Sequence, residues 1–156
     1  MTPLIPKRPQ LAAFAAILAL AFATVAPIAA ADAAPPSLYK RVGGYDAIAA
    51  VVDDFLGRLA SDQQLGRFFQ GTSQDTVKKI RQHLVDQVCA ATGGPCYYLG
   101  RDMKTTHAGL GITESDWNVM VGHFLATLKK FNVPQMETDE LVAIVATTKA
   151  AIVEKP

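Results

Sequence analysis

Four stretches of this chain carry apolar residues at the helical spacing i, i+3, i+4, i+7, at residues 45–60, 75–91, 117–128 and 141–152. Glycine, proline or short polar residues separate each stretch from the next. No segment shows the strict alternation of a half-buried strand. Because an amphipathic helix must bury its apolar stripe against another element, the pattern predicts an all-α fold of two longer helix pairs around one core.

Shorter segments complete this prediction. Residues 37–40 and 65–69 have the character of single helical turns, and a minimal helix at 103–108 carries His107. Thr113, followed by acidic residues, predicts the N-cap of the helix after it. On the helix at 75–91, the predicted inner stripe consists of Val77, Ile80, Leu84, Val88 and Ala91.

Residues 1–33 have the pattern of a cleaved signal peptide. Lys7 and Arg8 give a basic start, an uncharged run rich in alanine and leucine follows, and small residues at 31–33 fit a cleavage site. A retained membrane anchor is the alternative, since about twenty apolar residues can span a bilayer. The alanine content, Pro27 and the small-residue exit favour cleavage. We therefore expect a mature domain of residues 34–156, periplasmic or secreted, with no membrane association after cleavage.

The charge balance excludes two classes of partner. Cleavage would remove Lys7, Arg8 and Asp32, which leaves 13 basic and 13 acidic residues. A chain that is about neutral lacks the basic excess that nucleic acids or anionic membranes require. The roughly 120 remaining residues are enough for one domain with one core.

Cys89 and Cys96 are the only cysteines. In an exported protein a disulfide between them is the leading interpretation. Zinc is the competing one, with His83 and His107 as the further ligands, but the spacing contains no C-x2-C or H-x3-H pair.

Two of the three histidines are candidate metal ligands. His107 ends a segment that Gly109 and Gly111 close, and His83 lies at the edge of the inner stripe of another helix. In the alternative interpretation these histidines only cap helices or pack, as in a helical interaction module without a cofactor. His123 is predicted to be structural. Motifs of hydrolases, metalloproteases and phosphate-binding loops are absent from the sequence.

Several motifs occur in one order along the chain: Gly43-Gly44, Phe68-Phe69, Gly93-Gly94-Pro95 with Tyr98 after it, Met103-Lys104-x-x-His107, and Gly122-His123. In this order and spacing the chain resembles the truncated haemoglobins, group I, from about Leu38 to Val153. The resemblance implies a truncated globin-like two-over-two helical sandwich that encloses a haem.

The resemblance also implies roles for single residues. His107 matches the proximal iron ligand of a haem b, and Met103 in the same motif would contact the haem. Tyr98 and Lys104 fall where the family contacts the propionates, and a cation there would pair with a carboxylate.

Further matches concern the two faces of the haem. Phe69 would pack on the porphyrin and Trp117 over its edge. The distal positions, where group I members often carry tyrosine and glutamine, are occupied by Leu56 and Leu84, with Ile80 as a third wall. These apolar side chains cannot donate a hydrogen bond to bound dioxygen, so tight oxygen storage is not expected unless His83 donates that bond instead.

His83 matches a position that some cyanobacterial members use as a second, distal iron ligand. The leading hypothesis is a haem protein that reversibly binds dioxygen, nitric oxide or carbon monoxide, with nitric oxide oxidation and an electron-donating reductase as the candidate turnover. The alternative is a periplasmic electron-transfer protein with two histidine ligands. The chain has no C-x-x-C-H motif, so c-type attachment of the haem is not expected.

Overall fold

The structure, a computed structural model, describes residues 34–155, and the predicted signal peptide of residues 1–33 lies outside them. In chain order the elements are α1 (Leu38–Arg41), α2 (Gly44–Ser61), the 3₁₀ helix η1 (Gly66–Phe69), α3 (Gln74–Ala91), α4 (Met103–His107), α5 (Glu114–Lys130), α6 (Gln135–Ala146) and α7 (Lys149–Ile152). The described residues contain no β-strand, only an isolated bridge between Thr113 and Lys155. The all-α prediction is confirmed. In this part of the chain no helix combines the length and the apolar character needed to cross a membrane.

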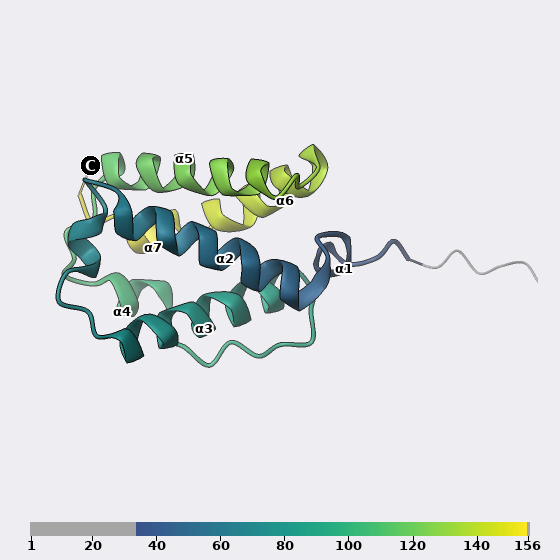
Figure 1. Cartoon of the computed structure of the whole chain (residues 1–156), viewed down its shortest axis with the longest axis horizontal. Helices are drawn as coiled ribbons and strands as arrows, with labels where there is room; N and C mark the ends of the chain where they lie inside the picture. Colours follow the sequence, from purple (N-terminus) through teal and green to yellow (C-terminus); the bar gives the residue numbers. More distant parts are fainter. Residues whose placement is uncertain (1–33, 156) are drawn as a thin grey trace, which may run out of the picture. The chain divides into compact units, whose positions relative to one another are not determined.

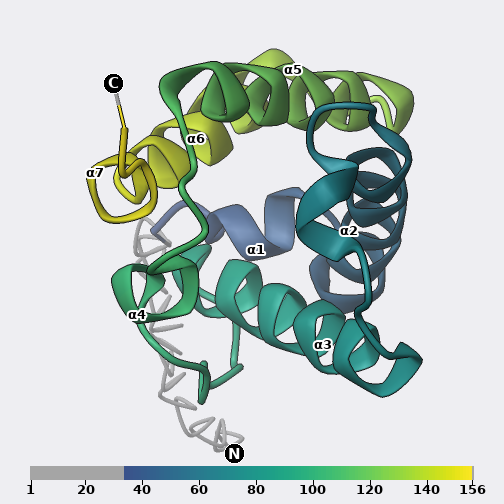
Figure 2. The same cartoon turned by 90° about the vertical axis from the view of Figure 1, so that its left-hand side faces the viewer.

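The longer helices form two antiparallel pairs (Figure 1). One pair is α2 with α3, and the other is α5 with α6 (Figures 1 and 2). The short helix α4 belongs to neither pair and contacts α7. This is the two-over-two arrangement that the sequence predicts.

Helix α2 packs on its partner α3 and also on α5 of the other pair. Its residues Ile48 and Val52 are buried against Val85 and Cys89 of α3. On another side, Phe55 meets Phe124 of α5 edge to face, with ring centroids 5.5 Å apart. Each buried apolar side chain of this size stabilises the fold by about 1.5–3 kcal/mol. The core therefore consists of two clusters that meet along α2.

The predicted inner face of α3 is incomplete, because Leu84 and Val88 pack against the cluster that α2 and α3 share but the two residues buried deepest in it were not predicted. Val85 and Cys89 are fully buried there, although the predicted stripe does not include them, and Val77 remains 42% exposed. The predicted stripe also faces a cavity, which four of its members line: Ile80, Leu84, Val88 and Ala91. Helix α3 therefore presents two apolar rows, one to α2 and one to the cavity.

The last predicted helix is also corrected, because the structure divides residues 141–152 between α6 and α7. The hydroxyls of Thr147 and Thr148 donate to the carbonyls of Ile144 and Val145, both at 2.7 Å. Threonine hydroxyls compete in this way with the backbone donors of a helix. The helix is therefore interrupted at Thr147 and Thr148, and α7, which follows the interruption, contacts α4.

Two predicted details of the chain path are confirmed. Thr113 is the N-cap of α5, where its hydroxyl accepts from the backbone of Asp116 and the Asp116 carboxylate accepts from the backbone of Thr113. Cys89 and Cys96 form a disulfide, which removes them as zinc ligands. No other group of residues in the described chain could hold a metal ion through three or more ligating side chains.

The turn that the disulfide closes depends on two glycines. Gly93 has a φ of +82°, which disfavours residues with a side chain. A Cβ atom on Gly94 would lie 2.5 Å from the Tyr39 ring and 2.6 Å from Cys89 Sγ. The chain therefore turns tightly against α1 before it reaches Tyr98.

We expect that removal of the disulfide lowers the free energy of unfolding by about 2–3 kcal/mol, because the unfolded chain regains the freedom of the short loop. The variant is Cys89→Ser with Cys96→Ser, and the measurement is urea unfolding with and without a reductant. Reductant should lower the wild-type midpoint and leave that of the variant unchanged. Equal midpoints for the reduced and oxidised wild-type protein would contradict the prediction.

Candidate functional site

The two helix pairs and α4 enclose a cavity of about 710 Å³. Cofactor pockets commonly measure roughly 300–1,000 Å³ and are mostly apolar. All the long helices contribute lining residues, and so do η1, α4 and the segment that follows the disulfide. Nine of the ten residues predicted to contact a cofactor line it: Leu56, Phe69, Ile80, His83, Leu84, Tyr98, Met103, His107 and Trp117.

His107 lines this cavity from the last residue of α4, and one of its ring nitrogens is already used. Nδ1 lies 2.8 Å from the carbonyl oxygen of Met103. Since a carbonyl oxygen only accepts, Nδ1 carries the proton and donates. The neutral ring then has its free lone pair on Nε2, which is the form that binds metals.

The start of α4 is fixed by its own N-cap. The Asp102 carboxylate accepts from the backbone N–H of Thr105 at 2.9 Å and from its hydroxyl at 2.7 Å. These hydrogen bonds hold the pKa of Asp102 below its ordinary value. A cap of this kind matters here because a helix of five residues gains little stability from its own backbone hydrogen bonds.

His83 and Tyr98 lie together on another side of the cavity. Their rings meet edge to face, with centroids 6.1 Å apart. The Tyr98 hydroxyl donates to the carbonyl of Arg101 at 2.6 Å. Burial raises the pKa of Tyr98, and the nearby charge of Asp102 adds to the effect, so Tyr98 remains a neutral phenol at physiological pH.

Lys104 is the predicted site residue that does not line the cavity, and its side chain is exposed on α4. Arg101, which the sequence analysis did not select, is among the lining residues. Gln87 was also missed, although it lies one helical turn after His83 on the same face of α3. The i, i+4 spacing could have found Gln87, whereas nothing in the spacing indicates Arg101. His123 is not a lining residue and instead pairs with Asp62 at 2.9 Å.

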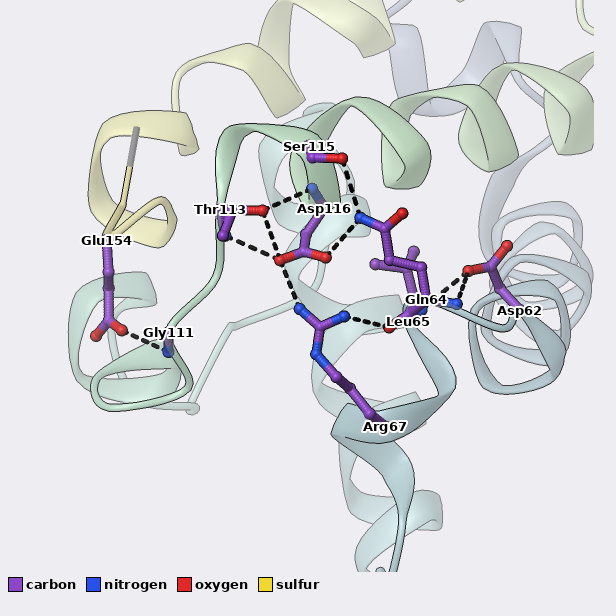
Figure 3. A network of polar contacts seen from close by, with 9 residues as sticks. All are labelled: Asp62, Gln64, Leu65, Arg67, Gly111, Thr113, Ser115, Asp116 and Glu154. Carbon is purple, nitrogen blue, oxygen red and sulfur yellow. Dashed lines mark hydrogen bonds and ion pairs between the residues drawn. The ribbon is translucent and has the colours of Figure 1, made fainter.

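A polar network joins η1 to the start of α5 beside the cavity (Figure 3). At its centre the carboxylate of Asp116, which is 2% exposed, accepts from the side chains of Gln64, Arg67 and Thr113, each at 2.8 Å. Burial alone would raise the pKa of Asp116. The hydrogen bonds from these three residues outweigh burial and hold the pKa well below its usual range. The network fixes η1, and with it Phe69, against α5.

A two-over-two helical fold around an apolar cavity, with a metal-competent histidine on a minimal helix, defines a truncated globin. The comparison with known proteins agrees, since residues 37–154 match the family model described as bacterial-like globin. The group 1 truncated hemoglobin GlbN of Mycolicibacterium paratuberculosis is 37% identical over 114 residues, which cover 73% of this chain and 82% of the relative. GlbN of Nostoc commune is 35% identical over 119 residues, covering 76% and 98%.

Solved structures agree as well. The 2/2 hemoglobin from Synechococcus sp., in the cyanomet state and with covalently attached heme, has a TM-score of 0.69 and 30% identity over 76% of this chain and 98% of that one. The chain belongs to the bacterial-like globin family, as a group 1 truncated haemoglobin. Membership implies a haem as the cofactor and small diatomic molecules as the ligands.

We expect that Asp116→Asn lowers the free energy of unfolding by about 2 kcal/mol at neutral pH, because it removes a buried charge that accepts several hydrogen bonds. The folded-state pKa of Asp116 lies below its unfolded value. Its contribution is therefore present above about pH 4 and is lost as the pH falls further. Urea unfolding between pH 7 and pH 2 measures both effects.

The matched control for Asp116 is Asp139→Asn, because Asp139 is exposed and its carboxylate accepts from Gln135. We expect this variant to remain within about 0.5 kcal/mol of the wild-type protein. The acid-dependent loss of stability should become smaller in Asp116→Asn and keep its size in the control. A wild-type loss of stability that Asp116→Asn does not reduce would contradict the assignment.

Proposed function

We propose that this protein binds a haem b in the cavity, with His107 as the protein ligand of the iron, and that it reversibly binds dioxygen, nitric oxide or carbon monoxide. The observation that carries the proposal is the Nδ1–H of His107 donating to the Met103 carbonyl. This hydrogen bond leaves Nε2 available, and a backbone acceptor on Nδ1 is the usual partner of a metal-ligating histidine.

The other lining residues fit the chemistry of a haem. The porphyrin is a flat apolar body, and Phe69 and Trp117 supply aromatic surface in the cavity. The propionates are carboxylates, and Arg101 is a lining residue whose guanidinium would pair with one of them. Lys104 is not a lining residue, so we propose Arg101 rather than Lys104 as the cation that pairs with a propionate.

When bound, the haem supplies an iron that can take a gas molecule opposite its histidine ligand. The residues proposed for that side are Leu56, Ile80 and Leu84, which offer no hydrogen-bond donor. His83 and Gln87 are the polar side chains of α3 that line the same cavity. This lining favours the binding of nitric oxide or carbon monoxide over the tight storage of dioxygen. Bound dioxygen carries partial negative charge, and the apolar side chains offer it no hydrogen-bond donor.

Turnover, if the protein is an enzyme, would be the oxidation of nitric oxide with dioxygen to nitrate. One nitric oxide and one dioxygen give one nitrate with the uptake of one electron. A separate reductase would have to supply that electron in each cycle.

We also propose that the mature protein works outside the cytoplasm, in the periplasm or after secretion. Support comes from the signal-peptide pattern of residues 1–33 and from the disulfide between Cys89 and Cys96. Disulfides persist in oxidising compartments and are rare in the cytosol.

The second candidate function is electron transfer with two histidines on the iron. It is favoured by His83, which lines the same cavity as His107 and is oriented by the Tyr98 ring. A second histidine ligand would have to leave before a gas binds, which lowers the apparent gas affinity by the fraction of protein in the open form.

We expect that His107→Ala loses stable haem, because the remaining contacts with the haem are mainly apolar. Haem titration followed at the Soret band measures the stoichiometry and affinity. The control His123→Gln changes a histidine outside the cavity lining and should still bind one haem. Full haem retention in His107→Ala would assign the iron to another ligand.

The bis-histidyl arrangement predicts a low-spin ferric spectrum that becomes high-spin in His83→Ala. Absorption and electron paramagnetic resonance spectra of the ferric protein measure the spin state. Gln87→Ala, one turn further along the same face of α3, is the control and should not change the spin state. A high-spin wild-type spectrum that His83→Ala leaves unchanged would exclude the second candidate function.

A further inference from the structure

The turn that follows His107 is held by a residue from the other end of the chain. The Glu154 carboxylate accepts from the backbone N–H of Gly109 through Oε1 and from that of Gly111 through Oε2, each at 2.6 Å. Figure 3 shows Glu154 beside Gly111. We call these two hydrogen bonds the Glu154 bridge. Glu154 lies 45 positions after Gly109 and 43 positions after Gly111 in the sequence.

The backbone amides of this turn need a hydrogen-bond acceptor from outside the turn. Gly109 and Gly111 have φ values of +80° and +65°, so the backbone here is left-handed and its amides are not used by a helix. Amides arranged around residues of this kind form a concave site for an anion. The carboxylate occupies that site, and the two amides lower the pKa of Glu154, which therefore stays ionised at neutral pH.

The backbone around Glu154 is itself fixed against the start of α5. The N–H groups of Glu154 and Lys155 donate to the carbonyl of Ile112, at 2.9 and 3.2 Å, and the N–H of Glu114 donates to Lys155 at 3.1 Å. Lys149 of α7 pairs with Glu114 at 2.6 Å. The bridge therefore connects the turn after His107 to a rigid part of the molecule.

His107 lies between two fixed points. On one side Nδ1 donates to Met103, and on the other the bridge holds residues 109–111. The N–H of Leu110, in the middle of that turn, also donates to the carbonyl of His107 at 3.2 Å. Because α4 is only five residues long, its own hydrogen bonds do not fix the last residue firmly.

We propose that Glu154 is a positioning residue for His107: through the amides of Gly109 and Gly111 it fixes the orientation of the imidazole that binds the iron. This inference rests on the proposed function, since it assumes His107 as the ligand. Glu154 does not line the cavity and hydrogen-bonds the amides of Gly109 and Gly111, so its effect passes through the backbone of the turn.

The test compares Glu154→Ala, which removes both acceptors, with Glu154→Gln, which keeps the length and one oxygen. Glu114→Gln is the matched control, since it removes a carboxylate charge and an ion pair at the same junction without touching the turn. The first readout is the iron–histidine stretching band in the Raman spectrum after photolysis of carbon monoxide, which reports the proximal bond whatever lies opposite. The second is the rate of haem loss to an excess of a haem-free acceptor protein.

We expect Glu154→Ala to shift or broaden the stretching band and to speed haem loss on the order of tenfold, the usual effect of removing a residue that orients a metal ligand. Glu154→Gln should show a smaller change of the same kind, and Glu114→Gln should match the wild-type protein in both readouts. Circular dichroism at the same temperature verifies that the variants are folded.

An unchanged band in Glu154→Ala would overturn the inference and leave the proposed function intact. Equal acceleration of haem loss in Glu154→Ala and Glu114→Gln, without a change in the band, would also overturn it, because that result reports general loosening of the junction. A wild-type protein without any iron–histidine band would overturn the proposed function itself, and the inference with it.

Discussion

The packing of α2 both against its partner α3 and against α5 of the other pair is the constraint on which the rest of this structure depends. Val52 meets α3 and Phe55 meets α5, so α2 holds the two pairs together along one line. The pairs diverge from this line, and apolar side chains of α2, α3 and α5 face the space between them. A core that contains a cavity of this size would ordinarily be less stable, because the side chains around an empty cavity lose packing contacts. In a globin the cavity is the site of the cofactor, so the apolar area that the helices leave uncovered is buried by the haem.

Polar contacts fix the elements that helix packing leaves poorly held. Asp116 ties η1 to α5 beside Phe69, and Glu154 holds the turn after His107. In each case a carboxylate accepts several hydrogen bonds from another part of the chain. Carboxylates with more than one donor are stable as anions. The site is therefore built from short elements whose positions depend on tertiary hydrogen bonds.

The residues that line the cavity are compatible with both proposed functions, gas binding and electron transfer. Leucine and isoleucine side chains next to His83 make one side of the cavity poor in donors. Whether His83 itself binds the iron decides how easily a gas can enter. His107 is the proposed iron ligand in both functions, and its tautomer is set by the Met103 carbonyl.

The sequence by itself determined the all-α class, the N-cap at Thr113 and the disulfide, and nine of the ten residues that it selected as cofactor contacts line the cavity. These follow from local periodicity, capping chemistry and ordered motifs. Only the tertiary structure decided that Val85 and Cys89 face α2, that Thr147 and Thr148 end α6, and that Arg101 rather than Lys104 lines the cavity. It alone brought Glu154 to Gly109 and Gly111. Spacing along a helix fixes which residues share a face, but which neighbour meets that face depends on how distant segments pack.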